Sequence, residues 1–208
     1  AGSETLSGGD GADIIRSGAG ANTIIAGEGA DKIVQGADAD TIDLTETTAA
    51  ADTITYTAQG DGSAAASAGA TITGYDTVTG FDPTLDVFRF DSNSADADPN
   101  ADFDAFAAPD ITAFQVVDHA SATNASYDLT DADFADADKL VTFMNDAGSA
   151  VATNCAAGEM DVVSIVFDTF TAIYIVDNAA TAAIAATEIE MLAKVDGAVL
   201  TATNTVDA

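Results

Sequence analysis

The residues with the clearest potential for chemistry are acidic side chains and glycines that recur every nine positions between residues 8 and 43. Four consecutive segments read GGDGADIIR, SGAGANTII, AGEGADKIV and QGADADTID. Their sixth position carries Asp13, Asn22, Asp31 and Asp40 in turn. Glycine adopts positive φ without a Cβ penalty, so each segment can make a tight turn that exposes its carbonyls. Two facing turns, each with a carboxylate, would offer the several oxygen ligands at flexible geometry that calcium prefers over magnesium.

The elements that position these turns must be very short. A period of nine residues is too brief for a helical solenoid and fits one turn plus one short strand. The eighth position of the four segments is Ile15, Ile24, Ile33 and Ile42. We expect these isoleucines to form an internal column. Glu4 and Leu6 continue the same phase backwards, so we expect the chain to start inside a longer array.

These segments resemble the glycine-rich nonapeptide repeats of RTX proteins, G-G-x-G-x-D-x-U-x, which build a parallel β-roll in secreted bacterial proteins. The resemblance implies bound calcium, two repeats in each coil, and an ion between each turn and the turn two repeats later. For the first ion it implies carbonyls of Gly8, Asp10, Gly27 and Gly29 with carboxylates of Asp13 and Asp31. For the second it implies carbonyls of Ser17, Ala19, Gly36 and Asp38 with side chains of Asn22 and Asp40.

The segments also depart from the family pattern. Ser17, Ala26 and Gln35 replace the first glycine of their repeats, and Asp38 replaces the glycine that the other three repeats carry at the fourth position. Asn22 removes one carboxylate from the second site. We therefore expect the first site to bind calcium more tightly.

The charge of the chain is extreme. Its 208 residues include 35 acidic and 5 basic side chains, giving a net charge of −30. Such a surface excludes nucleic acid and anionic membranes as partners. Repulsion opposes compaction until cations neutralise it, so we expect the roll to order when calcium binds. An acidic, lysine-poor surface is also common in proteins adapted to salty water, and the two causes are compatible.

The sequence predicts an all-β fold with about one helix. Residues 1–90 are expected to form the calcium-binding β-roll and its capping strands, and 91–208 a β-rich, sandwich-like region with a helix near 131–147. Thr130 and Asp133 resemble a capping box for that helix. VVSIVF and TAIYIV predict a hairpin, whereas 179–195 fits either helix or strand. The predicted core of the capping segment is Phe81, Leu85, Val87, Phe88 and Phe90.

Groups that would support catalysis are scarce. His119 is the only histidine, so a zinc site built from histidines is impossible, and it is expected to be a surface or satisfied side chain. The sequence has no H-E-x-x-H, G-x-S-x-G or P-loop motif. The single cysteine, Cys155, excludes an internal disulfide framework. An acidic loop at 92–110 lacks the glycine and the distal glutamate of an EF-hand, and we expect a solvated loop. The sequence therefore predicts no enzyme.

The expected location is extracellular. No apolar run reaches transmembrane length, and residues 1–9 lack the features of a signal peptide. The RTX resemblance implies type I secretion through an uncleaved C-terminal signal, with which residues 200–208 are compatible.

The leading hypothesis is a secreted calcium-binding structural protein that self-assembles into a surface layer, filament or adhesive array. Its partner would be a further copy of itself, with cell-surface polysaccharide as another candidate and no membrane insertion. The alternative is the C-terminal secretion and folding module of a type I-secreted enzyme such as a protease or lipase. A calcium-dependent carbohydrate adhesin is a third option.

Overall fold

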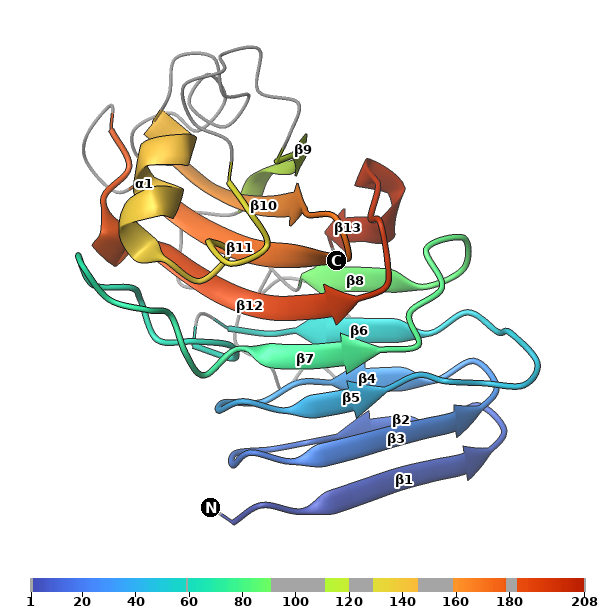
Figure 1. Cartoon of the computed structure of the whole chain (residues 1–208). Helices are drawn as coiled ribbons and strands as arrows, with labels where there is room; N and C mark the ends of the chain where they lie inside the picture. Colours follow the sequence, from blue (N-terminus) through green and yellow to red (C-terminus); the bar gives the residue numbers. More distant parts are fainter. Residues whose placement is uncertain are drawn as a thin grey trace.

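The molecule is built from two β-sheets that share one hydrophobic core (Figure 1). The computed structural model describes residues 2–58, 60–90, 111–119, 129–145, 159–178 and 183–207. Sheet A consists, in spatial order, of β1 (Thr5–Asp10), β3 (Thr23–Glu28), β5 (Thr41–Asp43), β7 (Asp76–Thr79), β12 (Ile189–Asp196), β11 (Phe170–Asn178), β10 (Glu159–Val166) and β9 (Ile111–Asp118). Sheet B consists of β13 (Thr205–Asp207), β8 (Val87–Phe90), β6 (Thr53–Tyr56), β4 (Lys32–Val34) and β2 (Ile14–Arg16).

The chain winds between the two sheets as a parallel β-roll. Successive strands from β1 to β8 alternate between sheet A and sheet B. Each strand from β1 to β6 pairs in parallel with the strand two further on in the chain. In the first coil Thr5 pairs with Thr23 and Ile14 with Lys32, both 18 residues apart. One coil therefore uses two nine-residue repeats, as the resemblance implied.

The predicted isoleucine column is confirmed, and it is double. Ile24 and Ile42 follow Leu6 along sheet A, while Ile15 and Ile33 stack in sheet B. Ile24, Ile33 and Ile42 are fully buried. The two columns face each other across the roll, because alternate side chains of a strand point to the same face. Their burial is the main apolar contribution to the stability of the repeats.

The roll continues after the nine-residue register is lost. Ile54 pairs with Ile33 and then with Phe88, and Val78 pairs with Ile42, so both columns extend through β6, β7 and β8. The additional residues lie in the connections, which lengthen without disturbing the strand register. Phe81, Phe88 and Phe90 are buried as expected, whereas Val87 is half-buried. The prediction for Leu85 was wrong: it lies in a turn just before β8 and is 41% exposed.

Beyond the roll, sheet A continues with β12, β11 and β10, which pair antiparallel, and with β9, which is parallel to β10. The predicted hairpin is confirmed as β10 and β11, which pair from Glu159↔Asn178 to Val166↔Thr171. The ambiguous segment 179–195 contains the short 3-10 helix η1 (Ala186–Glu188) and strand β12, so the strand interpretation holds for its second half. β12 pairs with β11 on one side and with β7 on the other. The two predicted regions therefore share one continuous sheet.

The single described α-helix, α1 (Ala137–Asn145), covers the outer face of β10, β11 and β12 (Figure 1). Leu140, Phe143 and Met144 bury one side of the helix in a second core cluster. The helix begins six residues later than predicted. Thr130 and Asp133 are hydrogen-bonded to each other, but they close a separate turn before the helix. Asp136 caps the helix by accepting the N–H groups of residues 138 and 139, both at 3.1 Å.

The prediction of an all-β fold with a parallel β-roll and about one helix is confirmed. Within the segment 200–208, which is compatible with an export signal, the described residues form the 3-10 helix η2 (Ala202–Asn204) and strand β13, which pairs with β8. Cys155 and the acidic loop 92–110 lie outside the described residues. Within the described residues, no helix has the length and apolar character needed to cross a bilayer.

Candidate calcium sites in the turns of the roll

The turns of the roll stack in two rows, one at each edge of the sheets. Row 1 consists of turns 8–13 and 26–31 followed by the longer connections 43–52 and 79–86, all running from sheet A to sheet B. Row 2 consists of turns 17–22 and 35–40 followed by connection 57–76, running from sheet B to sheet A. The structure thus places each predicted pair of calcium-binding turns next to each other.

Glycine allows these turns to stack closely. Gly27 has φ +106°, and a Cβ at this position would lie 2.0 Å from the carbonyl oxygen of Gly9 in the preceding turn of row 1. No side chain fits into that space. The turn backbones therefore approach within a distance at which their carbonyls can share an ion.

Asp38 occupies one of these glycine positions and is the only described non-glycine residue with positive φ, at 82°. This conformation is unfavourable for an L-residue with a Cβ atom. We expect Asp38→Gly to raise the free energy of unfolding by up to about 1 kcal/mol, because the steric cost exceeds the greater chain entropy of glycine. Urea unfolding at saturating calcium measures this change. Asp38→Asn is the control, since it removes the charge and keeps the Cβ; equal stabilisation by both variants would contradict the backbone explanation.

A ladder of carboxylates runs along row 1. The N–H of Asp13 donates to Oδ1 of Asp31 at 2.7 Å, and the N–H of Asp31 donates to Oδ1 of Asp52 at 2.8 Å. The N–H of Asp52 continues the series by donating to Oδ1 of Asp86 at 2.8 Å. Each aspartate therefore ties its turn to the turn before it.

Row 2 carries an equivalent ladder with one amide in it. The N–H of Glu4 donates to Oδ1 of Asn22 at 2.9 Å, and the N–H of Asn22 donates to Oδ1 of Asp40 at 2.7 Å. The N–H of Asp40 donates to Oδ1 of Asp76 at 2.7 Å. Glu4 thus occupies a ladder position, in agreement with the phase seen in the sequence.

The second carboxylate oxygen of several ladder residues has no hydrogen-bond partner although it is buried. These atoms are Oδ2 of Asp13, Asp31, Asp40 and Asp52. Asp31, Asp40 and Asp52 are at most 2% exposed. A buried carboxylate oxygen without a partner is strongly unfavourable unless a cation binds it. The donor set consists of hard oxygens, so it fits calcium.

The same burial perturbs the acidity of the ladder. Burial, and then the neighbouring charges, raise the pKa of Asp31. The same two causes raise the pKa of Asp52 more strongly, to about 7. Burial likewise raises the pKa of Asp40, and that of Asp76 to about 8. Without a cation the folded roll therefore disfavours the ionised carboxylates that its ladder uses.

Main-chain oxygens must complete any ion site here. Within the described residues, no group of three or more His, Cys, Asp or Glu side chains is arranged to hold a metal ion. The predicted carbonyl ligands of the first site, Gly8, Asp10, Gly27 and Gly29, all belong to the two stacked turns. The carbonyl oxygens that pack directly against the facing turn are those of Gly9, Gly11 and Ala26. The assignment of individual carbonyls stays a prediction, whereas Asp13 and Asp31 are brought together.

The second predicted site has fewer free acceptors. Asn22 donates its Nδ2 to the carbonyl of Ser17 at 3.1 Å, so a predicted ligand oxygen already has a protein donor. The hydroxyl of Tyr56 donates to Oδ2 of Asp76 at 2.8 Å and ends the row. Asp40 is then the one described row 2 residue with a buried carboxylate oxygen that has no hydrogen-bond partner. Ala19, Gly36 and Asp38 lie in the same two stacked turns.

Sequence reasoning missed three ladder residues: Asp52, Asp76 and Asp86. A signal for them exists, because every ladder aspartate precedes a buried apolar residue by two positions. This spacing is seen in Asp13 with Ile15, Asp31 with Ile33, Asp40 with Ile42, Asp52 with Ile54, Asp76 with Val78, and Asp86 with Phe88. The pattern persists where the glycines and the nine-residue period do not.

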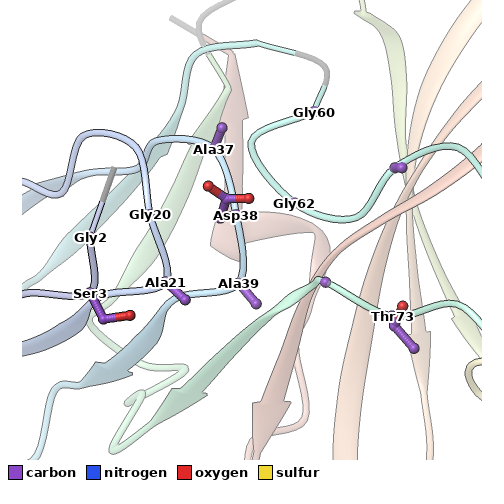
Figure 2. Close-up of a pocket in the computed structure, with 12 residues that line it drawn as sticks. Gly2, Ser3, Gly20, Ala21, Ala37, Asp38, Ala39, Gly60, Gly62 and Thr73 are labelled. Atoms are coloured by element: carbon purple, nitrogen blue, oxygen red, sulfur yellow. The ribbon is translucent and has the colours of Figure 1, made fainter.

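A cavity of about 740 Å³ lies beside row 2, under the long connection 57–76 (Figure 2). Its lining consists mainly of glycine and alanine, with the Asp38 carboxylate as the only charged group. Such a lining offers few groups for binding a ligand specifically.

The single histidine has a structural environment. His119 is half-buried, its Nδ1 lies 2.8 Å from the carbonyl oxygen of Val166, and its ring stacks on Phe167 with centroids 5.5 Å apart. This agrees with the expected satisfied side chain.

Another buried acid with a raised pKa lies away from the ladders. Glu190, on β12, is 8% exposed and accepts the N–H of Gly60. Burial, reinforced by the charge of Asp61, raises its pKa to about 7. The folded state therefore holds this proton more tightly than the unfolded state, so stability falls as the pH rises from about 4.5 to about 7.

We expect Glu190→Gln to remove this cost and keep the bond to Gly60. The variant should be more stable than the parent at pH 8, by on the order of 2 kcal/mol, and equal to it near pH 4. Urea unfolding across this pH range at saturating calcium measures the difference. A stability gain that is the same at both pH values would contradict the assigned pKa.

The fold and the ladders define a parallel β-roll with calcium-binding turns. Comparison with known families agrees: residues 1–33 match the family of RTX calcium-binding nonapeptide repeats, in four copies. Residues 1–33 therefore carry RTX-type nonapeptide repeats, and calcium is the ion that such repeats bind. No curated protein is significantly similar to the chain.

Proposed function

We propose that this chain is a secreted, calcium-binding structural protein that folds with calcium and self-assembles into a surface layer, filament or adhesive array. The calcium-binding repeats are established by the family match, and RTX repeat proteins are typically secreted. Self-assembly, the extracellular location and the absence of catalysis are the proposed parts. The observation that carries the proposal is the buried aspartate ladder with its unpartnered oxygens.

Calcium would control folding because the ladder concentrates like charges inside the roll. Desolvation, and then the charges of neighbouring acidic side chains, raise the pKa values of Asp31, Asp40 and Asp52, which are all nearly inaccessible to solvent. A divalent cation between two turns reverses that repulsion into attraction. An ion present at one hundred times its dissociation constant adds about 2.7 kcal/mol of stability. With a net charge of −30, this amount can decide whether the roll forms.

The end of the roll offers a surface for assembly. β1 and β2 are the edge strands of sheets A and B, and no described strand pairs with their outer sides (Figure 1). Ile14 and Ile25, on β2 and β3, are 55% and 42% exposed. Open edges and exposed isoleucines favour pairing with a further copy of the chain. Calcium would screen the negative charges that otherwise keep copies apart.

Light scattering and electron microscopy with and without millimolar calcium test the assembly. We expect ordered assemblies to form with calcium and to dissolve with chelator. Ile14→Lys and Ile25→Lys should reduce assembly and leave the calcium-induced circular dichroism unchanged. Monomers only, at millimolar calcium, would refute the structural role.

The alternative of a secretion and folding module for a protease or lipase shares the calcium-driven folding but needs no assembly. Monomers that fold with calcium would favour it. Nothing among the described residues resembles a catalytic arrangement, and we propose that the chain itself is not an enzyme. Cell-surface polysaccharide stays a candidate partner, which glycan binding with and without chelator would test.

A further inference from the structure

The aspartate ladder of row 1 continues into a connection that is not a nonapeptide repeat. Residues 43–52 contain no glycine and lie outside the segment that matches the repeat family. Asp52 nevertheless accepts the N–H of Asp31 through Oδ1, is 1% exposed, and has no partner for Oδ2. Asp31 has an unpartnered Oδ2 as well. Turn 26–31 and the adjoining connection 43–52 therefore each contribute one buried carboxylate oxygen without a hydrogen-bond partner.

Glu46 replaces a main-chain carbonyl in this space. In the first pair of turns, the N–H of Gly11 donates to the carbonyl of Glu28 at 2.7 Å. One coil later, the N–H of Gly29 donates at 2.7 Å to Oε1 of Glu46, which lies 18 positions after Glu28. Oε2 of Glu46 accepts the N–H of Ala50 at 2.7 Å, so the carboxylate is fixed in place. A full negative charge thus stands where the repeats have a carbonyl dipole.

A second set of hydrogen bonds holds connection 43–52 against turn 26–31. The carboxylate of Glu28 accepts the N–H of Thr47 at 2.8 Å and the N–H of Thr48 at 3.2 Å. These bonds substitute for the close glycine packing of the repeats. The geometry around Asp31 and Asp52 is therefore preorganised without a glycine-rich turn.

We propose that a calcium ion binds between turn 26–31 and connection 43–52, held by the Oδ2 atoms of Asp31 and Asp52 together with main-chain carbonyls. Glu46 positions the connection and adds negative charge beside the ion. Asp31 then contributes to two ions, one on each side of its turn. Calcium binding in row 1 thus extends one coil beyond the nonapeptide repeats.

The row ends at the following connection. Both carboxylate oxygens of Asp86 accept N–H groups, from Asp52 at 2.8 Å and Asp82 at 2.7 Å. The side-chain amide of Asn204 donates to the carbonyls of Pro83 at 2.8 Å and Asp86 at 3.0 Å. Protein donors therefore occupy these oxygens in the last turn. Row 1 accordingly holds two ions and not three.

The stoichiometry of calcium binding tests this inference. Titration calorimetry and native mass spectrometry on the full chain should show one ion fewer for Asp52→Asn than for the parent, with the other ions retained. Asn can still accept the N–H of Asp31, so the fold should be kept, as circular dichroism at 10 mM calcium would verify. An unchanged number of ions in Asp52→Asn would overturn the proposal.

Two further variants make the result specific. Asp13→Asn should also remove one ion, the one between the repeat turns. Glu28→Gln weakens the hydrogen bonds to Thr47 and Thr48 without removing a proposed ligand, so this variant should bind as many calcium ions as the parent. Should Asp52→Asn fail to fold, Glu46→Gln decides: we expect about tenfold weaker binding of one ion, and parental affinity for every ion would overturn the proposal.

The inference rests on calcium binding, which the proposed function shares, and not on self-assembly. If Asp13→Asn removes an ion and Asp52→Asn does not, only this additional site fails. If neither variant changes calcium binding, the calcium-folding part of the proposed function fails as well.

Discussion

Asp31→Asn is expected to abolish the calcium-induced ordering of the β-roll. Asp31 lies in the middle of row 1, is 2% exposed, and carries a buried oxygen without a partner. Its amide replacement keeps an acceptor for the N–H of Asp13 but removes the charge that binds the ion. Each lost ion forfeits about 2.7 kcal/mol at one hundred times its dissociation constant. Calcium titration followed by far-ultraviolet circular dichroism should show little gain of β signal.

Asp10→Asn is the matched control for this experiment. Asp10 lies in turn 8–13, its side chain is exposed, and the substitution leaves its main-chain carbonyl unchanged. This variant removes the same charge from the same row and should fold with calcium like the parent. A parental response in Asp31→Asn, or an equal loss in Asp10→Asn, would show that general charge and not the ladder controls folding.

Removal of calcium is expected to unfold the roll more than the region under α1. The unpartnered oxygens of Asp31, Asp40 and Asp52 lie at the turns of the roll, whereas the second core cluster beneath α1 contains no ladder residue. Hydrogen exchange with chelator should therefore lose protection in β2 to β6, by about a hundredfold for each released ion. Protection in β10 and β11 should fall much less.

Magnesium and sodium chloride separate specific binding from screening. Magnesium demands near-octahedral geometry and loses its water reluctantly, so it should restore little protection at equal concentration. Molar sodium chloride screens the net charge without binding in the turns, and should restore only part of it. Full recovery in sodium chloride alone would favour adaptation to salt over calcium-controlled folding.

The repeats could be interpreted from the sequence because their constraints are local. A glycine at each positive-φ position, an aspartate at the sixth place and an isoleucine at the eighth recur with one period, and this predicts turns, ladder and column together. The register of Thr5 with Thr23 and the burial of Ile24, Ile33 and Ile42 follow from it. The resemblance supplied the calcium and the two repeats per coil.

Longer connections limited what the sequence could show. Asp52, Asp76 and Asp86 are 21, 36 and 34 residues from the ladder partners that donate to them, so no fixed period reveals them. The helix start was misplaced because Thr130 and Asp133 satisfy each other in a turn, which has the same short-range pattern as a capping box. Leu85 was predicted to be in the core because its side chain is apolar, although it lies in a turn and is exposed.

The sequence by itself determined the local chemistry of this protein: the turn-forming glycines, the acidic ligands and the apolar column, all set by interactions within a few residues. The tertiary structure alone decided which aspartates meet. Stacking of coils brings Asp31 beside Asp52, places Glu46 against Gly29, and sets Asn204 over the end of the row. The physical reason is that parallel strand pairing fixes register between residues far apart in the chain, and the length of the intervening connection has little effect on it.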